Sequence, residues 1–504
     1  MKKSNLKPTG AAQPFEVNET FFSMTDRRGV ITAGNRVFSR VSGYSLEEMI
    51  GQPHNLVRHP GMPRLVFQRL WETIKAGKPF MGYVQNLTRT GNHYWVFAIV
   101  VPLPDGYLSV RFKPTSRLLA QVEDLYRQMI AQEEAAIERG ESEAKAALVS
   151  APLLEAKLRA LGHASYDAFS HAALNTEIKS RDADIARRGL RLFPERIGTD
   201  SNQRLRDVYD RTLGAYAGLN TLFADLDAFG ASAEGIRRHH AVVRSIVEGL
   251  RLNALNAHIA VEPLGQAAVT IGTVAQFLAG YASNLATNIA TLTGKIETTS
   301  TAITEVASSV SSARVQLEMF LSFVAEIAAE DRDPAARRTV QALARSLLDA
   351  FAGTLRHATR AVESLRITLP ALKGHREELR RDIVSLQVAQ VAGLTECARL
   401  NGAENLRETF TSLREQIETG KRELDELGDV VALLTALSAS TPPKIAQIET
   451  AIERVPEDLS RETEMPAPVV TADVASATNA APPAAVERPL RVPAGLRLPE
   501  LVFA

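Results

Sequence analysis

The pattern of apolar and polar residues changes near residue 116. Before that point, "TFFSMTD", "GVITAGN", "FMGYVQNLT", "HYWVFAIVVPL" and "GYLSVRFK" are short β-branched or aromatic runs bounded by turn residues, and each predicts a strand. Two short helices and an amphipathic helix, "RLVFQRLWETIKAG", are predicted between the second and third strands. After residue 116, Ala, Leu, Glu, Arg and Gln dominate, which favours helix.

This order predicts a small α+β domain over residues 19–116. We expect a five-stranded antiparallel sheet with flanking helices, an arrangement that can enclose a ligand. Residues 1–18 are predicted to be an N-terminal tail. Residues 117–198 are predicted to be a helical connector, with breaks at Pro152 and Gly162.

A seven-residue apolar repeat dominates the region from 199 to 330. Such spacing is typical of a coiled coil, and Pro263 with Gly265 offers a reversal. The sequence therefore predicts an antiparallel helical hairpin over 199–330 whose apolar stripes pack on each other and, we expect, on a second chain. The repeat consists of Ile289, Ile296, Ile303, Val310, Leu317 and Val324.

The last part of the chain divides into a helical and a proline-rich region. Residues 331–440 predict an additional helical region, which we interpret as another long hairpin. Residues 441–504 hold ten of the 24 prolines and are rich in Ala, Val and Thr. This composition predicts a disordered tail.

Charge and cysteine content narrow the class of protein. Lys plus Arg equals Asp plus Glu at 58 each, so nothing in the net charge favours nucleic acid as a partner. The single cysteine, Cys397, excludes an internal disulfide and suits a reducing compartment. We find no signal peptide and no run of about 18 apolar residues, and therefore expect a cytoplasmic protein without a membrane span.

The segment "PHNLVRHP", residues 53–60, carries the clearest candidate chemistry. His54 and His59 have poor spacing for a metal site and no carboxylate nearby, and no partner for acid–base catalysis is evident. We therefore expect no metal here and no enzymatic activity, and interpret the segment as the wall of a binding pocket. Three further histidines, His239, His240 and His258, are expected to be solvated or polar interface positions rather than ligands.

The first region resembles the PAS domain of bacterial aerotaxis receptors. The resemblance runs almost without gaps from about Thr20 to Thr115, through "TDRRGVITAGNRVFSRVSGYSLEEMIGQPHNLVRHPGMP", "LWETIKAGKPFMGYVQN" and "GNHYWV". This sequence departs from the family at two positions. The family has an acidic residue where Gly61 stands here, and a Trp where Phe80 stands here.

The ligand of that family is FAD, so the resemblance implies a flavin site. Carried over by position, it implicates His54, Arg58, His59 and Trp71 as cofactor-binding residues. Arg58 can pair with a phosphate or with the negative charge of a reduced flavin, and Trp71 can pack on an aromatic ring system.

A second stretch, "LNALNAHIAVEPLG" followed by "VAQFLAGYA", resembles the signalling tip of methyl-accepting chemotaxis receptors in degenerate form. In that family the turn docks a histidine kinase and its coupling protein through a Glu, a Gly-Arg-Gly and a Phe. Here those positions read "QAAVTI", residues 266–271. We therefore expect weak or no binding of that kinase and coupling protein.

Together these features indicate a PAS-containing sensory signal transducer of the aerotaxis or redox type. It would act as a homodimer, sensing through FAD and relaying the signal to its helical module. The alternative is a non-enzymatic scaffold protein whose PAS domain is empty or holds another ligand and does not regulate a kinase.

Overall fold

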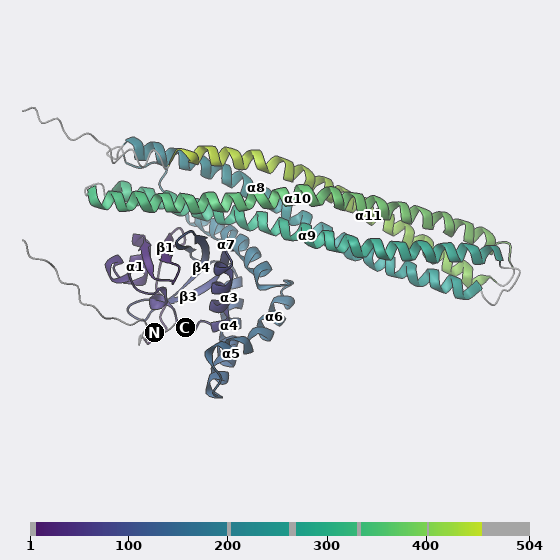
Figure 1. Cartoon of the computed structure of the whole chain (residues 1–504), viewed down its shortest axis with the longest axis horizontal. Coiled ribbons are helices and arrows are strands. Elements are labelled where there is room, and N and C mark those ends of the chain that lie inside the picture. The colour runs from purple at the N-terminus through teal and green to yellow at the C-terminus, as the bar shows by residue number, and fades with distance from the viewer. Residues whose placement is uncertain (1–6, 199–202, 262–268, 330–333, 401–402, 456–504) are drawn as a thin grey trace, which may run out of the picture.

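The computed structural model describes residues 7–198, 203–261, 269–329, 334–400 and 403–455 of the 504-residue chain. A small α+β domain lies at the N-terminus, and four long helices form a bundle beside it (Figure 1). Four shorter helices connect the two.

The sheet has five antiparallel strands, as predicted. Their spatial order is β2-β1-β5-β4-β3. Along each strand, successive side chains point alternately to an inner face, toward the short helices, and to an outer face, toward the rest of the chain. Phe97 and Phe112 stack on each other and are fully buried. The strands are β1 (Thr20–Asp26), β2 (Ile31–Gly34), β3 (Phe80–Leu87), β4 (His93–Leu103) and β5 (Gly106–Phe112).

Helices α1 (Arg36–Ser42), α2 (Leu46–Met49) and α3 (Arg64–Lys75) flank the inner face. A capping box begins α2, because the Ser45 side chain accepts from the Glu48 amide and the Glu48 side chain accepts from the Ser45 amide. Part of "PHNLVRHP" is regular, since His54–Val57 forms one 3-10 turn, η1, that begins after Pro53. Proline is compatible with a helix start, where its missing N–H leaves no bond unmade.

The connector contains α4 (Leu118–Glu138), α5 (Glu143–Val149), α6 (Ala151–Ala160) and α7 (Tyr166–Arg188). The predicted breaks are correct: Pro152 lies in the first turn of α6, and Gly162 follows its end with a φ of 83°. Helix α7 lies between the sheet and the bundle (Figure 1) and packs on both β3 and α9.

Two helical hairpins of the same chain form the bundle. Its helices are α8 (Gln203–Val261), α9 (Val269–Ala329), α10 (Pro334–Cys397) and α11 (Glu404–Glu453). Helix α8 packs on α9 and α11, and α10 packs on the same two neighbours. The heptad positions predicted from Ile289 to Val324 are all buried. The reversal predicted at Pro263 and Gly265 lies outside the described residues.

The helices that cover the α8–α9 hairpin differ from those expected. We expected its apolar stripes to pack on a second chain, whereas α10 and α11 cover them in the structure. The physical reason is that α11 carries its own apolar stripe, which is buried against α8. The homodimer itself stays a prediction.

Two predicted boundaries differ from the structure. Part of the predicted N-terminal tail packs on the domain, because Phe15 and Val17 are buried and the Gln13 amide donates to the His93 carbonyl. The proline-rich tail was expected from residue 441, but α11 continues through Pro442 and Pro443 to Glu453. Buried isoleucines at 445, 448 and 452 extend its stripe and outweigh the two prolines. The remaining tail, 456–504, lies outside the described residues.

The α+β domain lies beside the half of the bundle that contains the C-terminal end of α9 (Figure 1). Phe22 of β1 makes an edge-to-face contact with Phe323 of α9, with ring centroids 5.3 Å apart. The Arg36 amide donates to Glu326 of α9 over 3.0 Å. None of the described helices is long and apolar enough to cross a membrane.

Candidate functional site

His54 lies at the inner face of the sheet, next to a cation that sequence reasoning did not identify. Its Nε2 is 2.8 Å from a guanidinium nitrogen of Arg111 on β5 and 3.1 Å from Ser23 Oγ on β1. Arg111 also donates to Ser23 Oγ over 3.0 Å, so the three side chains form a closed triangle. Since a guanidinium can only donate, Nε2 of His54 accepts and the imidazole is neutral. Burial, and then the charge of Arg111, lower the pKa of His54 to about 3.

Arg111 is a buried cation without an anionic partner. Its exposed fraction is 4%, and in the described part of the chain no ion pair joins it to a carboxylate. Burial lowers its pKa to about 10. The Oγ of Ser109, two residues earlier and on the same face of β5, is buried and has no hydrogen-bond partner among the described residues. Arg111 and Ser109 could therefore bind a polar, negatively charged group at the inner face.

Arg58 and His59 lie apart from this triangle. The Arg58 guanidinium stacks on the Phe67 ring of α3, 3.9 Å from its centroid. Burial and the charge of Arg64 lower its pKa to about 10, against the opposing charges of Glu133 and Glu143. His59 accepts from the Gly61 amide over 2.9 Å and contacts the His93 ring edge-on. Burial lowers its pKa to about 4.

Trp71 of α3 covers the turn between β1 and β2. A Cβ added at Gly29, whose φ is 80°, would lie 2.8 Å from the indole, so only glycine fits beneath it. The indole also packs edge-on against Tyr107 of β5. Because the His54 amide donates to the Gly29 carbonyl over 2.9 Å, Trp71 and His54 flank the same residue. The structure therefore brings two of the four predicted residues close together and leaves Arg58 and His59 elsewhere.

The outer face of the sheet is joined to α7 by one buried carboxylate. Glu177 accepts from Tyr83 Oη of β3 over 2.6 Å and from the Thr115 and Ser116 amides over 2.7 and 3.0 Å. The Ser116 hydroxyl donates a fourth bond over 2.6 Å. Glu177 is fully buried, so these donors replace the water that it lacks.

One turn further along α7, Arg181 joins the same face to the bundle. Its guanidinium stacks on Phe112 of β5, 4.8 Å from the ring centroid, and forms an ion pair with Glu318 of α9. Both partners of this pair are almost fully buried. Glu318 also accepts from Tyr216 of α8 over 2.8 Å. A continuous set of polar contacts therefore runs from the sheet through α7 to α9 and α8.

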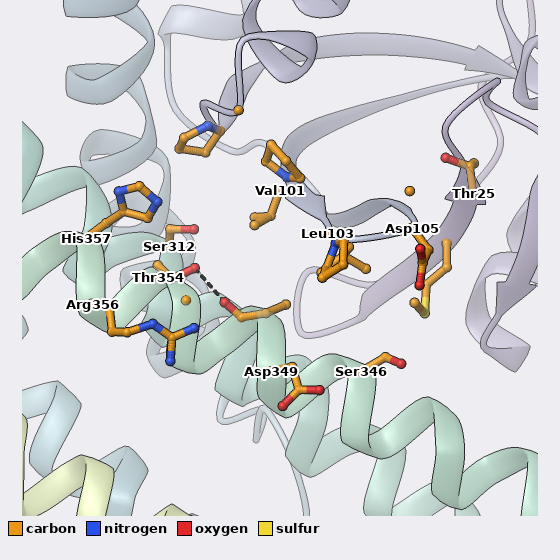
Figure 2. Close-up of a pocket in the computed structure, with 18 of the residues that line it drawn as sticks. Thr25, Val101, Leu103, Asp105, Ser312, Ser346, Asp349, Thr354, Arg356 and His357 are labelled. Carbon is orange, nitrogen blue, oxygen red and sulfur yellow. Dashed lines mark hydrogen bonds between the residues drawn. The ribbon is translucent and has the colours of Figure 1, made fainter.

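A cleft of about 590 Å³ separates the β4–β5 turn from α9 and α10 (Figure 2). Asp105 borders it on the sheet side, and Asp349, Arg356 and His357 border it on α10. Its volume is in the range of small-molecule pockets. None of His54, Arg58, His59 and Trp71 lines it, so it is separate from the predicted flavin site.

Comparison with known proteins identifies the N-terminal domain. A family model described as PAS fold matches residues 31–110. The aerotaxis receptor of Escherichia coli (strain K12) is 44% identical over 119 residues, which are 23% of this chain and 24% of the receptor. The nitrogen fixation regulatory protein of Klebsiella pneumoniae is 35% identical over 88 residues, 17% of this chain and 18% of that protein.

Two further proteins are similar to part of this chain. Biofilm dispersion protein BdlA of Pseudomonas aeruginosa is 32% identical over 82 residues, 16% of this chain and 20% of that protein. The crystal structure of a PAS domain from Colwellia psychrerythraea is 25% identical and covers 19% of this chain and 88% of that chain, with a TM-score of 0.19. The matches span about a quarter or less of the curated relatives.

The family model matches residues from β2 to β5, which include the helices that flank the sheet. The long helices that follow have the hairpin form expected of a chemotaxis-receptor module. The N-terminal part of this chain is therefore a PAS domain similar to a segment of the aerotaxis receptor, followed by a helical region consistent with a chemotaxis-receptor-like signalling region.

Proposed function

We propose that this chain is a non-enzymatic sensory signal transducer whose PAS domain binds a flavin, FAD, and relays its redox state to the helical bundle. The observation that carries the proposal is Arg111, a buried guanidinium at the inner face of the sheet without a carboxylate partner. A buried charge without a counter-ion is costly, and a negatively charged ligand would remove that cost.

The residues at the inner face fit such a ligand. Arg111 and the unpartnered Ser109 hydroxyl offer charge and hydrogen bonding, and neutral His54 offers a polar ring edge. Trp71 offers an aromatic surface next to His54. Arg58 and His59, which the resemblance also implies, lie apart from this group, next to Phe67 and His93. FAD would supply reversible electron uptake, which changes the charge and hydrogen bonding that these side chains meet.

The relay that we propose runs through α7. Glu177 holds the end of β5 and Tyr83 of β3, while Arg181 holds Glu318 of α9. Since the two α7 residues are one helical turn apart, a shift of the sheet relative to α7 changes both sets of contacts. This path supports a role for the bundle as the receiver of the signal.

The visible absorption spectrum of gently purified full-length protein, before and after addition of FAD, tests the flavin proposal. We expect flavin bands that bleach on reduction. Arg111→Met should lower FAD affinity by at least about tenfold, because the charge-assisted bonds to the ligand are lost. Arg89→Met is the matched control, since Arg89 is an exposed cation of the same domain that pairs with Glu48.

A colourless protein that does not take up added FAD would contradict the flavin proposal and favour the scaffold alternative. Equal FAD affinity in the Arg111 and Arg89 variants would show that the buried guanidinium does not face the ligand.

A further inference from the structure

A histidine and two glutamates meet between the first and the last helix of the bundle. His239 belongs to α8, and Glu423 and Glu426 are three positions apart on α11, so both carboxylates lie on the helix face toward α8. One ligand atom from each side chain lies within 4.8 Å of the others. The proposed flavin sensing makes no use of this cluster.

The distances in the cluster suit a small metal ion. Nδ1 of His239 is 2.9 Å from a Glu423 oxygen and 3.5 Å from a Glu426 oxygen. Bonds of about 2.0–2.2 Å in a tetrahedral zinc site separate neighbouring ligand atoms by roughly 3.3 Å. The two measured distances bracket this value, so small side-chain movements would complete the geometry.

Burial and charge also suit a divalent cation. The His239 side chain is 4% exposed and the Glu423 side chain 16%, which holds both in place, whereas Glu426 is 49% exposed. The two carboxylates balance a charge of +2, and the open side at Glu426 gives an entry path and room for a water ligand. Imidazole with carboxylates is a ligand set that zinc accepts.

Without a metal, Arg238 sets the tautomer of the imidazole. A guanidinium nitrogen of Arg238 is 3.2 Å from Nε2 of His239, and because it can only donate, Nε2 accepts and Nδ1 carries the proton toward Glu423. A metal at Nδ1 requires the other tautomer, with the proton on Nε2. Metal binding would therefore move one proton within the ring, release none, and turn the exposed Arg238 side chain away.

We propose that His239, Glu423 and Glu426 bind one divalent transition-metal ion, with Zn²⁺ as the best match. The ion links α8 of the first hairpin to α11 of the second. A bound ion therefore clamps the two hairpins together and stabilises the bundle. The structure confirms His239 as a polar position between α8 and α11, and the proposal adds a role as metal ligand.

Calorimetric titration of metal-free full-length protein with Zn²⁺ tests the proposal. We expect one ion per chain and a melting temperature that rises with Zn²⁺. His239→Ala and Glu426→Gln should each lower the affinity at least about tenfold; the second replaces a half-exposed side chain, so it also tests the site if the first variant folds poorly. Arg238→Ala should bind Zn²⁺ more tightly, because its competing hydrogen bond is absent.

His375→Ala is the matched control, since His375 of α10 makes a similar 2.9 Å contact with Glu378 and no second carboxylate of the described residues completes a cluster there. It should bind Zn²⁺ like the unaltered chain. Absence of stoichiometric binding by the unaltered chain would overturn the proposal. So would unchanged affinity in both the His239 and the Glu426 variants.

Discussion

The guanidinium of Arg111 donates to Nε2 of His54, which can accept this bond only while the imidazole is neutral. At the scale of single residues, this contact explains why His54 resists protonation: the charged imidazole would lose its bond to Arg111 and meet a like charge 2.8 Å away. The same contact keeps Arg111 oriented toward the interior of the PAS domain, where the proposed ligand would meet it.

This arrangement predicts that the PAS domain loses stability in acid. The pKa of His54 is about 3 in the fold, below its value of about 6.5 in an unfolded chain, so the unfolded state takes up the proton first as the pH falls. Stability contributed by neutral His54 is thus complete above pH 6.5 and is lost as the pH falls from there toward 3. Between pH 7 and pH 5 we expect a loss of about 1–2 kcal/mol.

Urea unfolding followed by tryptophan fluorescence measures this loss, because both tryptophans, Trp71 and Trp95, lie in the PAS domain. His54→Gln should show a smaller loss over the same pH interval. An equal pH dependence in the variant and the unaltered chain would mean that His54 is not held neutral by the fold.

The residues of the candidate site were only partly predictable from sequence. His54 stands out between two prolines, and both His54 and Trp71 stand out through the resemblance to the aerotaxis-receptor PAS domain. Arg111 does not, since "SVRFK" reads as an ordinary strand with alternating polarity. The signal available was that alternation, which places Arg111 and Ser109 on the same face as Tyr107. Only the tertiary structure shows that this face is the interior.

At the scale of elements, α7 is the main connection between sensor and bundle. Glu177 and Arg181 are both fully buried. Glu177 accepts hydrogen bonds from the segment after β5, whereas Arg181 forms an ion pair with Glu318 of α9. From the sequence this region was predicted only as a helical connector, and an i, i+4 Glu–Arg spacing normally indicates a solvated helix face. Here the two side chains turn away from water, and tertiary contacts determine their role.

Glu318→Gln should destabilise the protein by about 3–5 kcal/mol, because it leaves the Arg181 guanidinium buried without its carboxylate. Urea denaturation followed by circular dichroism measures the effect. The matched control is Lys179→Ala, which removes an exposed ion pair between α7 and Asp227 of α8 and should change stability by less than about 1 kcal/mol. Similar stability in the two variants would contradict a central role for the Arg181–Glu318 pair.

Helix α11 illustrates a second limit of sequence reasoning. Its end was predicted near residue 441 because the sequence from there on is rich in Pro, Ala, Val and Thr. Ile448 packs against Gly218 of α8, where a Cβ at the glycine would lie 3.0 Å from the isoleucine side chain. This close packing holds the last turns of α11 on α8. Proline content alone therefore does not mark the end of a helix that packs on a partner helix.

At the scale of the whole molecule, one chain supplies all four helices of the bundle. Heptad spacing predicts that an apolar stripe will be buried, and the burial of Ile289 through Val324 confirms it. The pattern does not say which helix covers the stripe, and a second hairpin in the same chain serves as well as a second copy. The PAS domain contacts the bundle through β1, β4 and β5, and α7 of the connector packs on both, so sensor and bundle meet within a single chain.

The central claim is that the redox state of a PAS-bound flavin reaches the bundle through α7. Hydrogen–deuterium exchange of FAD-loaded protein in the oxidised and the reduced state tests this claim most directly. We predict that exchange changes with reduction in α7 around Glu177 and Arg181 and in α9 around Glu318. Glu318→Gln should abolish the change in α9 and preserve that in the PAS domain. Identical exchange of α7 and α9 in the two redox states would contradict the claim.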